Sequence, residues 1–258
     1  MTQGLVVRPW QTMYTEASVL KALASLSRSG FVDAIGTLDS AIIIAGGRGR
    51  HDLILDLIKK IQGLYLPSKR LQEENISQTL STPVIQVQTA LRSILALDSA
   101  PSFFAFQKHY CHGPFILRDY ANNWPALSRW SSMHYLRTVA GPGRIVPIEL
   151  GKDYRTLDWT QKLMPWDEFL SCLHQPSSQV YLAQHNLFMQ FPELRDDIYP
   201  PDYVYAALDA PNYTPPANEE RLITNVWFGP AGTISPAHTV SEFQSTFDIL
   251  IASTGPLL

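Results

Sequence analysis

The apolar residues of this chain follow two different patterns, and the change from one to the other divides the sequence. From about residue 15 to residue 66, apolar residues recur at steps of three and four, which places them on one face of a helix. The recurring residues are Val19, Leu20, Leu23, Leu26, Phe31, Ile35 and Leu38, and then Leu53, Leu55, Leu57, Ile58, Ile61 and Leu64. This periodicity predicts a helical N-terminal region.

The second pattern follows a polar stretch at residues 67–82 and consists of short strand-like runs. Tryptophan, tyrosine, phenylalanine and proline become frequent, and the long helical periodicity disappears. The strand-like runs are Ile116–Leu117, Val146–Leu150, Gln179–Ala183 and Leu222–Phe228, with a further strand expected to start near Pro83. Short strands separated by loops rich in proline, glycine and asparagine favour a small barrel or sandwich. We therefore place the domain boundary within residues 67–90.

Composition narrows the class of protein. Of the 258 residues, 45% are hydrophobic and 17% are charged, which is typical of a globular chain. The net charge of −3, with no long basic run, gives no indication of nucleic-acid binding. With only Cys111 and Cys172, a disulfide framework is excluded and a reducing compartment is favoured. We find no signal peptide or membrane span and expect a nuclear or cytoplasmic protein.

Two short motifs invite functional interpretations that their contexts do not favour. The glycines of Gly46–Arg50 lack the spacing of a phosphate-binding loop and stand between helical stretches, so we interpret this segment as an interhelical turn. His109–His112 holds metal-capable side chains, but no second cluster completes a zinc site. We interpret it as the end of a short helix capped by Ser102.

Longer segments, in order along the chain, resemble a known family. They are Gly113–Ser131 with Tyr135–Leu136, Arg144–Gly151 with Trp159–Met164 and Trp166–Leu170, Tyr181–Phe188 with Phe191–Ile198, and Asn225–His238. Together they are similar to the JmjC-domain oxygenases, which use Fe(II) and 2-oxoglutarate, and within them to the jumonji-domain protein 5 (lysine demethylase 8) branch. The resemblance covers about residues 80–238 and rests on several motifs in the correct order.

The resemblance implies an α+β fold in three parts. Residues 1–80 form a helical N-terminal region, residues 81–240 form a partial cupin/JmjC-like domain, and residues 241–258 form a divergent tail. The second part is expected to be an incomplete double-stranded β-helix, because the residues after His238 do not follow the family pattern.

The metal site that the resemblance implies is incomplete. In this family two histidines and a carboxylate hold the iron, and the first histidine corresponds to His238. The carboxylate would stand at residue 240, which is Val240 here, and residues 241–258 contain neither histidine nor lysine. We therefore expect this chain to bind neither Fe(II) nor 2-oxoglutarate. Glu242 is a less favoured substitute ligand, since it requires a helix where the family has a strand.

Four further residues match pocket positions of the family. By resemblance, Tyr181 and Ser235 contact the co-substrate, and Gln184 and Trp227 line the substrate pocket. The alternative is structural, because a tyrosine and a tryptophan on adjacent strands bury a large apolar area without any ligand. With the metal site broken, we favour the structural interpretation.

Two functional hypotheses from different classes follow. The first is a JmjC-type protein hydroxylase or demethylase that acts on a protein or peptide side chain. The second is a non-catalytic fragment or pseudoenzyme that acts, if at all, as a protein-interaction module. The H-x-D pair and the distal histidine separate the two hypotheses, and both features are absent from this sequence. We therefore predict a member of an oxygenase lineage that is inactive as given.

Overall fold

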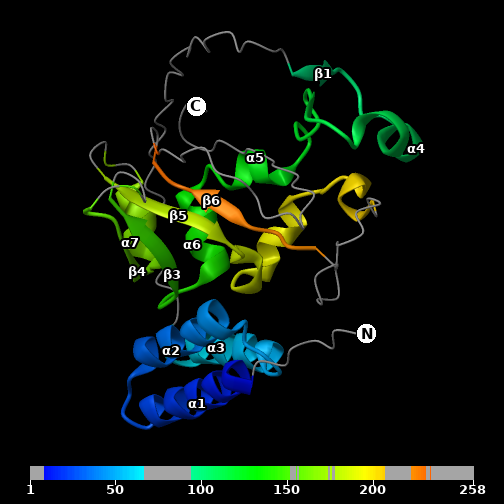
Figure 1. The fold of residues 1–258 in the computed structure, drawn as a ribbon. Coiled ribbons are helices and arrows are strands. Elements are labelled where there is room, and N and C mark those ends of the chain that lie inside the picture. The colour runs from blue at the N-terminus through cyan, green and yellow to red at the C-terminus, as the bar shows by residue number, and fades with distance from the viewer. Residues whose placement is uncertain are drawn as a thin grey trace.

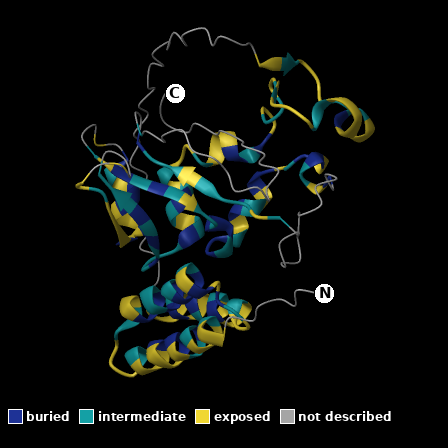
Figure 2. Cartoon of the chain, viewed as in Figure 1, coloured by how far each residue is buried: buried dark blue, intermediate teal, exposed yellow. Residues whose placement is uncertain are grey.

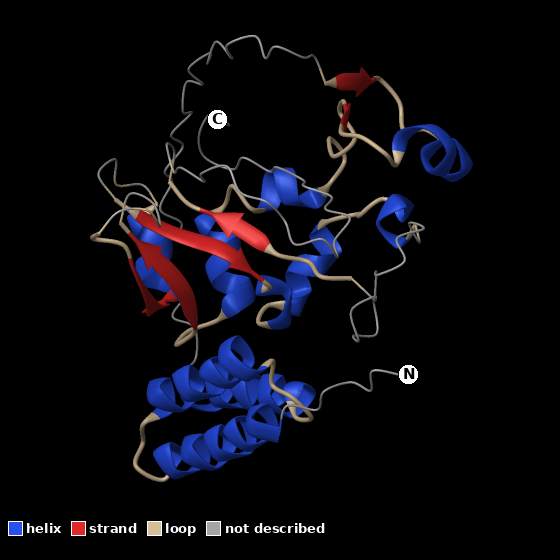
Figure 3. Ribbon diagram, viewed as in Figure 1, coloured by secondary structure: helices blue, strands red, loops and turns tan. Residues whose placement is uncertain are grey.

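The computed structural model has an α+β fold, in which a bundle of three helices lies against a second region built on an antiparallel sheet (Figure 1). It describes the chain at residues 9–66, 94–151, 155, 157–173, 175, 178–206, 222–230 and 233. Figure 3 shows the division plainly, with helices alone in the first region and all of the strands in the second. The fold class predicted from the sequence is confirmed.

The helical region consists of α1 (Pro9–Leu26), α2 (Phe31–Ala45) and α3 (His51–Tyr65). Its core is apolar and contains Val19, Ala22, Ala34, Ile35, Leu38, Ile42, Ile54, Ile58 and Ile61. Of the residues predicted to share the apolar face, Leu20, Leu23, Leu53 and Leu64 are instead exposed. Gly46 ends α2 in the left-handed conformation, with φ of 67°, which a residue without Cβ adopts at little cost. The glycine-rich segment is therefore an interhelical turn, as predicted.

A small peripheral unit precedes the main sheet. Strand β1 (Leu95–Leu97) pairs in parallel with β2 (Phe115–Leu117), and between them lie α4 (Phe103–Ala105) and the π-helical turn η1 (Phe106–Tyr110). The Ser102 hydroxyl accepts a hydrogen bond from the amide of Ala105 at 3.2 Å, which confirms the predicted cap. Residues 109–112 accordingly end this short helical segment.

The main sheet has the strand order β4-β3-β5-β6, and each neighbouring pair is antiparallel. Its strands are β3 (Ile145–Leu150), β4 (Thr160–Pro165), β5 (Val180–His185) and β6 (Val226–Phe228). The register places Val146 opposite Met164, Glu149 opposite Tyr181 and Leu182 opposite Phe228. Because side chains alternate along a strand, this register decides which residues share a face.

One face of the sheet is covered by helices and forms the larger core. The helices are α5 (Pro125–Arg129), α6 (Met133–Ala140) and α7 (Trp166–Cys172), and the turns η2 (Leu187–Met189), η3 (Pro192–Asp197) and η4 (Asp202–Tyr205) complete the region. Val146, Ile148, Val180 and Leu182 point into this core, where the Trp166 ring packs on Phe169 and Phe191. Figure 2 shows buried positions along the strands and the helices of this region.

Asp197 is the polar anchor of this core. It is fully buried, and its carboxylate accepts hydrogen bonds from Arg129 at 2.7 Å, from Trp130 at 2.8 Å and from the Tyr135 hydroxyl at 2.6 Å. Three donors satisfy a charge that would otherwise be costly to bury. Burial and the neighbouring carboxylate together raise the pKa of Tyr135. The contacts tie α5, α6 and η3 into one unit.

The strand runs predicted from the sequence correspond to β2, β3, β5 and β6, whereas β1 and β4 were not predicted as strands. The strand expected near Pro83 and the domain boundary within residues 67–90 lie outside the described residues, so the three-part division stays a prediction. Among the helices that the structure describes, none combines the length and the apolar character needed to cross a membrane.

Candidate functional site

The candidate site is the face of the sheet opposite the helical core. Pro147, Glu149, Leu163, Tyr181 and Trp227 alternate with the core-facing residues of their strands, and we call this set the outer face. Trp227 has 42% of its surface exposed, although the next residue, Phe228, packs against Trp166 and Phe169. The alternation in β6 therefore sends one aromatic ring into the core and presents the other outward.

Tyr181 lies on the outer face beside the end of β6. Leu182 pairs with Phe228, so Tyr181 stands opposite Gly229. A Cβ at Gly229 would lie 3.0 Å from Cδ2 of Tyr181 and 2.6 Å from the Thr233 hydroxyl, which is closer than atoms pack. The glycine thus allows the tyrosine ring to approach the backbone. Two of the predicted pocket residues, Tyr181 and Trp227, lie on the same face of the sheet, and their role in a pocket stays a prediction.

Glu149 supplies the charged group of the outer face, and the sequence analysis did not identify it. Its carboxylate accepts hydrogen bonds from the Trp159 indole at 3.1 Å and from the Gln161 amide at 3.4 Å, both of which are neutral donors. It stands opposite Tyr181 in the register. Its position in the alternating run Val146–Leu150 could have indicated that Glu149 lies on the outer side of a strand. Only the pairing of β3 with β5 shows that Tyr181 is its neighbour.

Gln184, the third predicted pocket residue, occupies an irregular position. The pairing of β5 with β6 shifts between Leu182 and His185, and Gln184 has a φ of 47° within this bulge. A positive φ is uncommon outside glycine and is maintained only where the surrounding structure imposes it. The bulge leaves Gln184 exposed at the end of the strand rather than in the regular alternation of the outer face.

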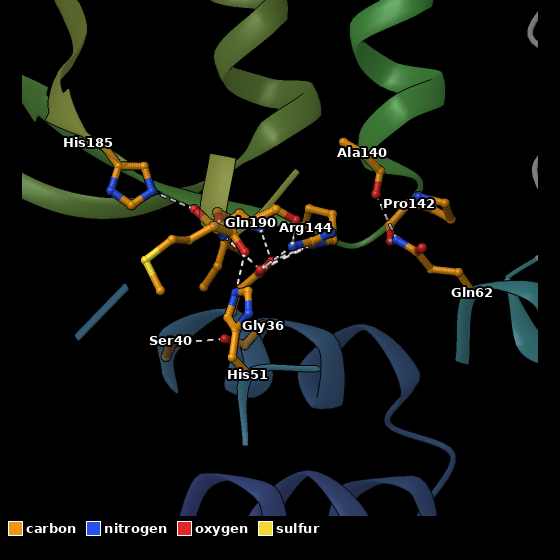
Figure 4. A network of polar contacts seen from close by, with 12 residues as sticks. Gly36, Ser40, His51, Gln62, Ala140, Pro142, Arg144, His185 and Gln190 are labelled. Atoms are coloured by element: carbon orange, nitrogen blue, oxygen red, sulfur yellow. Dashed lines mark hydrogen bonds and ion pairs between the residues drawn. The ribbon is translucent and has the colours of Figure 1, made fainter. Parts of the chain in front are cut away.

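Directly after Gln184, a buried polar network joins the sheet region to the helical region (Figure 4). Its centre is Asp39 of α2, which is fully buried and accepts from Arg144 Nε and Nη2, at 2.7 to 3.1 Å, and from the amide of Ile145 at 2.9 Å. Gln190 donates to the same carboxylate at 2.7 Å. Four different donor groups therefore satisfy the buried charge, and Arg144 pairs with it in bidentate fashion.

His185 connects this network to β5. Since the Gln190 amide nitrogen donates to Asp39 and to the Ile145 carbonyl, its oxygen is left to accept from His185 Nε2 at 2.7 Å. The proton of a neutral His185 therefore lies on Nε2. Burial lowers the pKa of His185, and the Gln190 hydrogen bond and the charge of Asp39 offset only part of that effect.

Helix α3 makes a second set of contacts with the sheet region. Gln62 donates to the carbonyls of Ala140 and Pro142 at 3.0 and 2.8 Å, and His51 Nε2 donates to the Met189 carbonyl at 2.8 Å. Lys59 forms an exposed ion pair with Glu193 at 2.8 Å. The bundle therefore contacts the segment that precedes β3 and the turns that follow β5, close to the bulge at Gln184.

The described residues do not provide a metal centre. Within them, no group of three or more histidine, cysteine, aspartate and glutamate side chains is placed to hold a metal ion. His238 and Ser235, together with Val240, lie outside the described residues. The sequence of the motif still shows whether its side chains can bind iron, because valine at 240 has no lone pair with which to coordinate a metal ion. At residue 240 the motif therefore lacks the carboxylate donor that the iron site of the family uses.

Comparisons with known proteins identify the family. Residues 102–240 match the cupin-like domain family. Lysine-specific demethylase 8 of Danio rerio is 41% identical over 254 residues, which is 90% of this chain and 59% of that protein. Lysine-specific demethylase 8 of Xenopus tropicalis is 39% identical over 163 residues (62% of this chain, 34% of that protein). Jumonji C domain-containing protein 5 of Drosophila melanogaster is 42% identical over 147 residues (54% and 35%).

The chain thus spans between 34% and 59% of the length of these relatives. The matched segment includes β2 to β6, which carry the core and the outer face. The chain belongs to the cupin-like JmjC family, in the branch of lysine-specific demethylase 8 and Jumonji C domain-containing protein 5.

Proposed function

We propose that this 258-residue chain is a member of the oxygenase family that does not turn over 2-oxoglutarate. The observation that carries the proposal is the replacement of the metal-binding carboxylate by Val240, two residues after His238. A 2-His-1-carboxylate site holds iron through three protein ligands and leaves open positions for the reactants. One histidine next to an apolar side chain supplies neither the affinity nor the geometry for this chemistry.

The test is succinate production by the purified chain with Fe(II), 2-oxoglutarate and oxygen. We expect no succinate above a blank that contains the metal alone, and no change on His238→Ala. The matched variant Val240→Asp restores the second ligand. We expect it to remain inactive, because residues 241–258 contain no further histidine. Fe(II) binding, followed by calorimetry, should be equally weak in the unmodified chain and in His238→Ala, and Val240→Asp should raise it without giving turnover.

Iron-dependent succinate production that is abolished by His238→Ala would overturn the proposal. It would also identify an additional ligand, for which Glu242 is the first candidate. Glu242→Gln would then remove the activity as completely as His238→Ala does. The double comparison separates a second metal ligand from a contaminating enzyme, since a contaminant would not respond to either substitution.

A second function, binding of a protein segment, is supported by the outer face. On the outer face Tyr181 stands opposite Glu149 in the register, and Trp227 offers an exposed aromatic ring on the strand next to that of Tyr181. This arrangement suits a side chain with an apolar stem and a cationic end. Lysine has this chemistry, and two of the relatives are named lysine-specific demethylases. We propose that the outer face binds a lysine-bearing segment of a partner protein without modifying it.

Titration of lysine-containing peptides against the full chain tests this second function. We expect Trp227→Ala and Glu149→Gln to weaken binding at least about tenfold, a loss typical of central contacts. Leu64→Ala, a change at an exposed position of α3 in the helical region, should have no effect. Equal binding of a peptide with norleucine in place of lysine would exclude recognition through the cationic end.

A further inference from the structure

An irregularity in the pairing of β5 with β6 lies directly opposite Trp227. Leu182 pairs with Phe228, and His185 pairs with Val226. The two residues of β5 between these pairs therefore stand opposite a single residue of β6, which is Trp227. This arrangement is a β-bulge, and a bulge changes the direction in which nearby side chains point. The exposed ring of the outer face is thus carried by the strand segment that faces the bulge.

The bulge turns His185 toward the core. In a regular strand side chains alternate, so Leu182 and His185, three positions apart, would point to opposite faces. The extra residue cancels this alternation, and His185 shares a face with its partner Val226, which packs against the core. From this face the imidazole reaches Gln190, with Nε2 2.7 Å from Oε1 (Figure 4). The hydrogen bond is therefore available because of the bulge.

Gln190 is a rigid acceptor for this bond. Its side chain is fully buried, and Nε2 donates to Asp39 at 2.7 Å and to the Ile145 carbonyl at 2.9 Å. Its backbone carbonyl accepts from Arg144 at 2.9 Å. A flipped amide would place Oε1 against the Asp39 carboxylate and the Ile145 carbonyl, both of which only accept hydrogen bonds. Oε1 therefore has a single orientation, toward His185.

The backbone of the bulge is strained at Gln184. Its φ of 47° lies in the left-handed region, which a residue with a side chain adopts only where the surrounding structure imposes it. Gln184 itself is exposed, so its side chain does not anchor the bulge in the core. The next residue, His185, is the one that bonds to the buried Gln190. This bond is therefore a contact that can hold the strained backbone in place.

We propose that Gln190 is a positioning residue for the outer face, acting through His185 on the bulge that places Trp227. The proposal rests on the function proposed above, in which the outer face binds a lysine-bearing segment. Strand β6 has three residues and stands at the edge of the described sheet, so its neighbour β5 determines its position. Gln190 is in turn anchored on Asp39 of α2. The helical region thereby helps to determine where the exposed ring of the sheet region lies.

His185→Leu tests the bond, because it removes the donor and keeps a side chain of similar size. Gln190 Oε1 is then buried without its partner, which favours a rearrangement of the bulge. We expect the dissociation constant of a lysine-containing peptide to rise about three- to tenfold, the range of a single hydrogen bond. His185→Gln is the rescue variant, since its amide can donate in place of Nε2. It should bind the peptide as the unmodified chain does.

The indole N–H resonance of Trp227, assigned by nuclear magnetic resonance with Trp227→Phe, reports the position of the ring without any peptide. We expect it to shift in His185→Leu and to return in His185→Gln. Both variants lack the imidazole, so the loss of that ring alone does not separate them. His51→Leu is the matched control, because it removes a histidine hydrogen bond between the same two regions, to the Met189 carbonyl at 2.8 Å, without touching β5. It should leave the resonance unchanged.

The outcomes separate this proposal from the function on which it rests. A Trp227 resonance that is unchanged in His185→Leu, that does not return in His185→Gln, or that moves equally in His51→Leu would each overturn the positioning role. So would peptide binding by His185→Leu that equals binding by the unmodified chain. An unmodified chain that binds no lysine-containing peptide would instead overturn the binding function, and the resonance would still decide whether Gln190 positions Trp227. Thermal melts followed by circular dichroism verify that each variant is folded.

Discussion

The helical region and the sheet region bury different kinds of contact. In the helical region the core consists of aliphatic residues that lie three or four positions apart within each helix, such as Ile54, Ile58 and Ile61. In the sheet region aromatic rings pack across elements that are distant in sequence, and Asp197 is buried among them. The first kind of core is local and uniform, whereas the second depends on long-range partners.

The contact between the two regions also depends on residues that are distant in sequence, as the core of the sheet region does. Asp39 belongs to the helical region, but it is the buried anion that holds Arg144 and Gln190 of the sheet region. We call these contacts of Asp39 with Arg144 and Gln190 the joint between the two regions. Because a buried charge is tolerated only with its full set of partners, removal of one partner should lower the free energy of unfolding strongly. The apolar cores should respond more gradually. This difference can be measured, and the largest effect is expected at Arg144.

Arg144→Met should destabilise the chain most. The substitution leaves the Asp39 carboxylate buried without its bidentate partner, and a loss of about 3–5 kcal/mol in the free energy of unfolding is expected. Arg50→Met is the matched control, since it removes an ion pair that is exposed on both partners and should cost less than about 1 kcal/mol. Urea denaturation measures both. Equal losses would show that the joint does not depend on its buried charge.

Gly141→Ala should have an intermediate effect. Gly141 has a φ of 68°, and an added Cβ would lie 2.7 Å from the Gln62 amide, so Gln62 would lose its bonds to Ala140 and Pro142. We expect a loss of about 2–3 kcal/mol, combining backbone strain and broken hydrogen bonds.

Gly49→Ala is the matched control for Gly141→Ala. Gly49 has a φ of 74° with no atom within 4 Å of the added Cβ, so this variant carries the strain alone. Its loss should be about 1–2 kcal/mol smaller than that of Gly141→Ala. The difference between the two isolates the contribution of Gln62 to the joint, and no difference would exclude such a contribution.

The pH dependence of stability should be the smallest effect, and it tests the connection between β5 and the joint. Burial lowers the folded-state pKa of His185 below the ordinary value of 6.5, so the unfolded chain binds a proton more readily. Stability is therefore complete above about pH 6.5 and falls as the pH drops toward the folded pKa, by at most about 1.4 kcal/mol per pH unit. His185→Gln should flatten the difference measured between pH 7.5 and pH 5.5, and an unchanged slope would assign it to other groups.

Local sequence patterns predicted the structural elements that are determined by residues close together in the sequence. The spacing of apolar residues identified the helical region, Ser102 identified a cap, and the glycines after α2 identified a turn. Strand β4 escaped prediction because Thr160, Gln161, Lys162 and Leu163 are all exposed at the edge of the sheet, so their sequence lacks a clear alternation. An edge strand with one weakly buried face gives little signal.

The candidate site was only partly predictable, for the same reason. Family-like motifs pointed to Tyr181 and Trp227, and the strand register does bring them to one face. Gln184 matched a pocket position, but its place in a bulge depends on how β6 pairs with β5. Glu149 was missed because its neighbour Tyr181 is assigned by the pairing of β3 with β5 rather than by any local motif.

The sequence by itself determined the helical periodicity, the resemblance to the family and the valine at residue 240, because each follows from the identity and order of nearby residues. Only the tertiary structure decided that Asp39 pairs with Arg144, 105 residues away, and that one aromatic ring of β6 is buried while its neighbour faces outward. The physical reason is that the stability of a buried charge and the burial of a strand face depend on groups that are close in space but distant in sequence. Those partners exist only once the chain has folded.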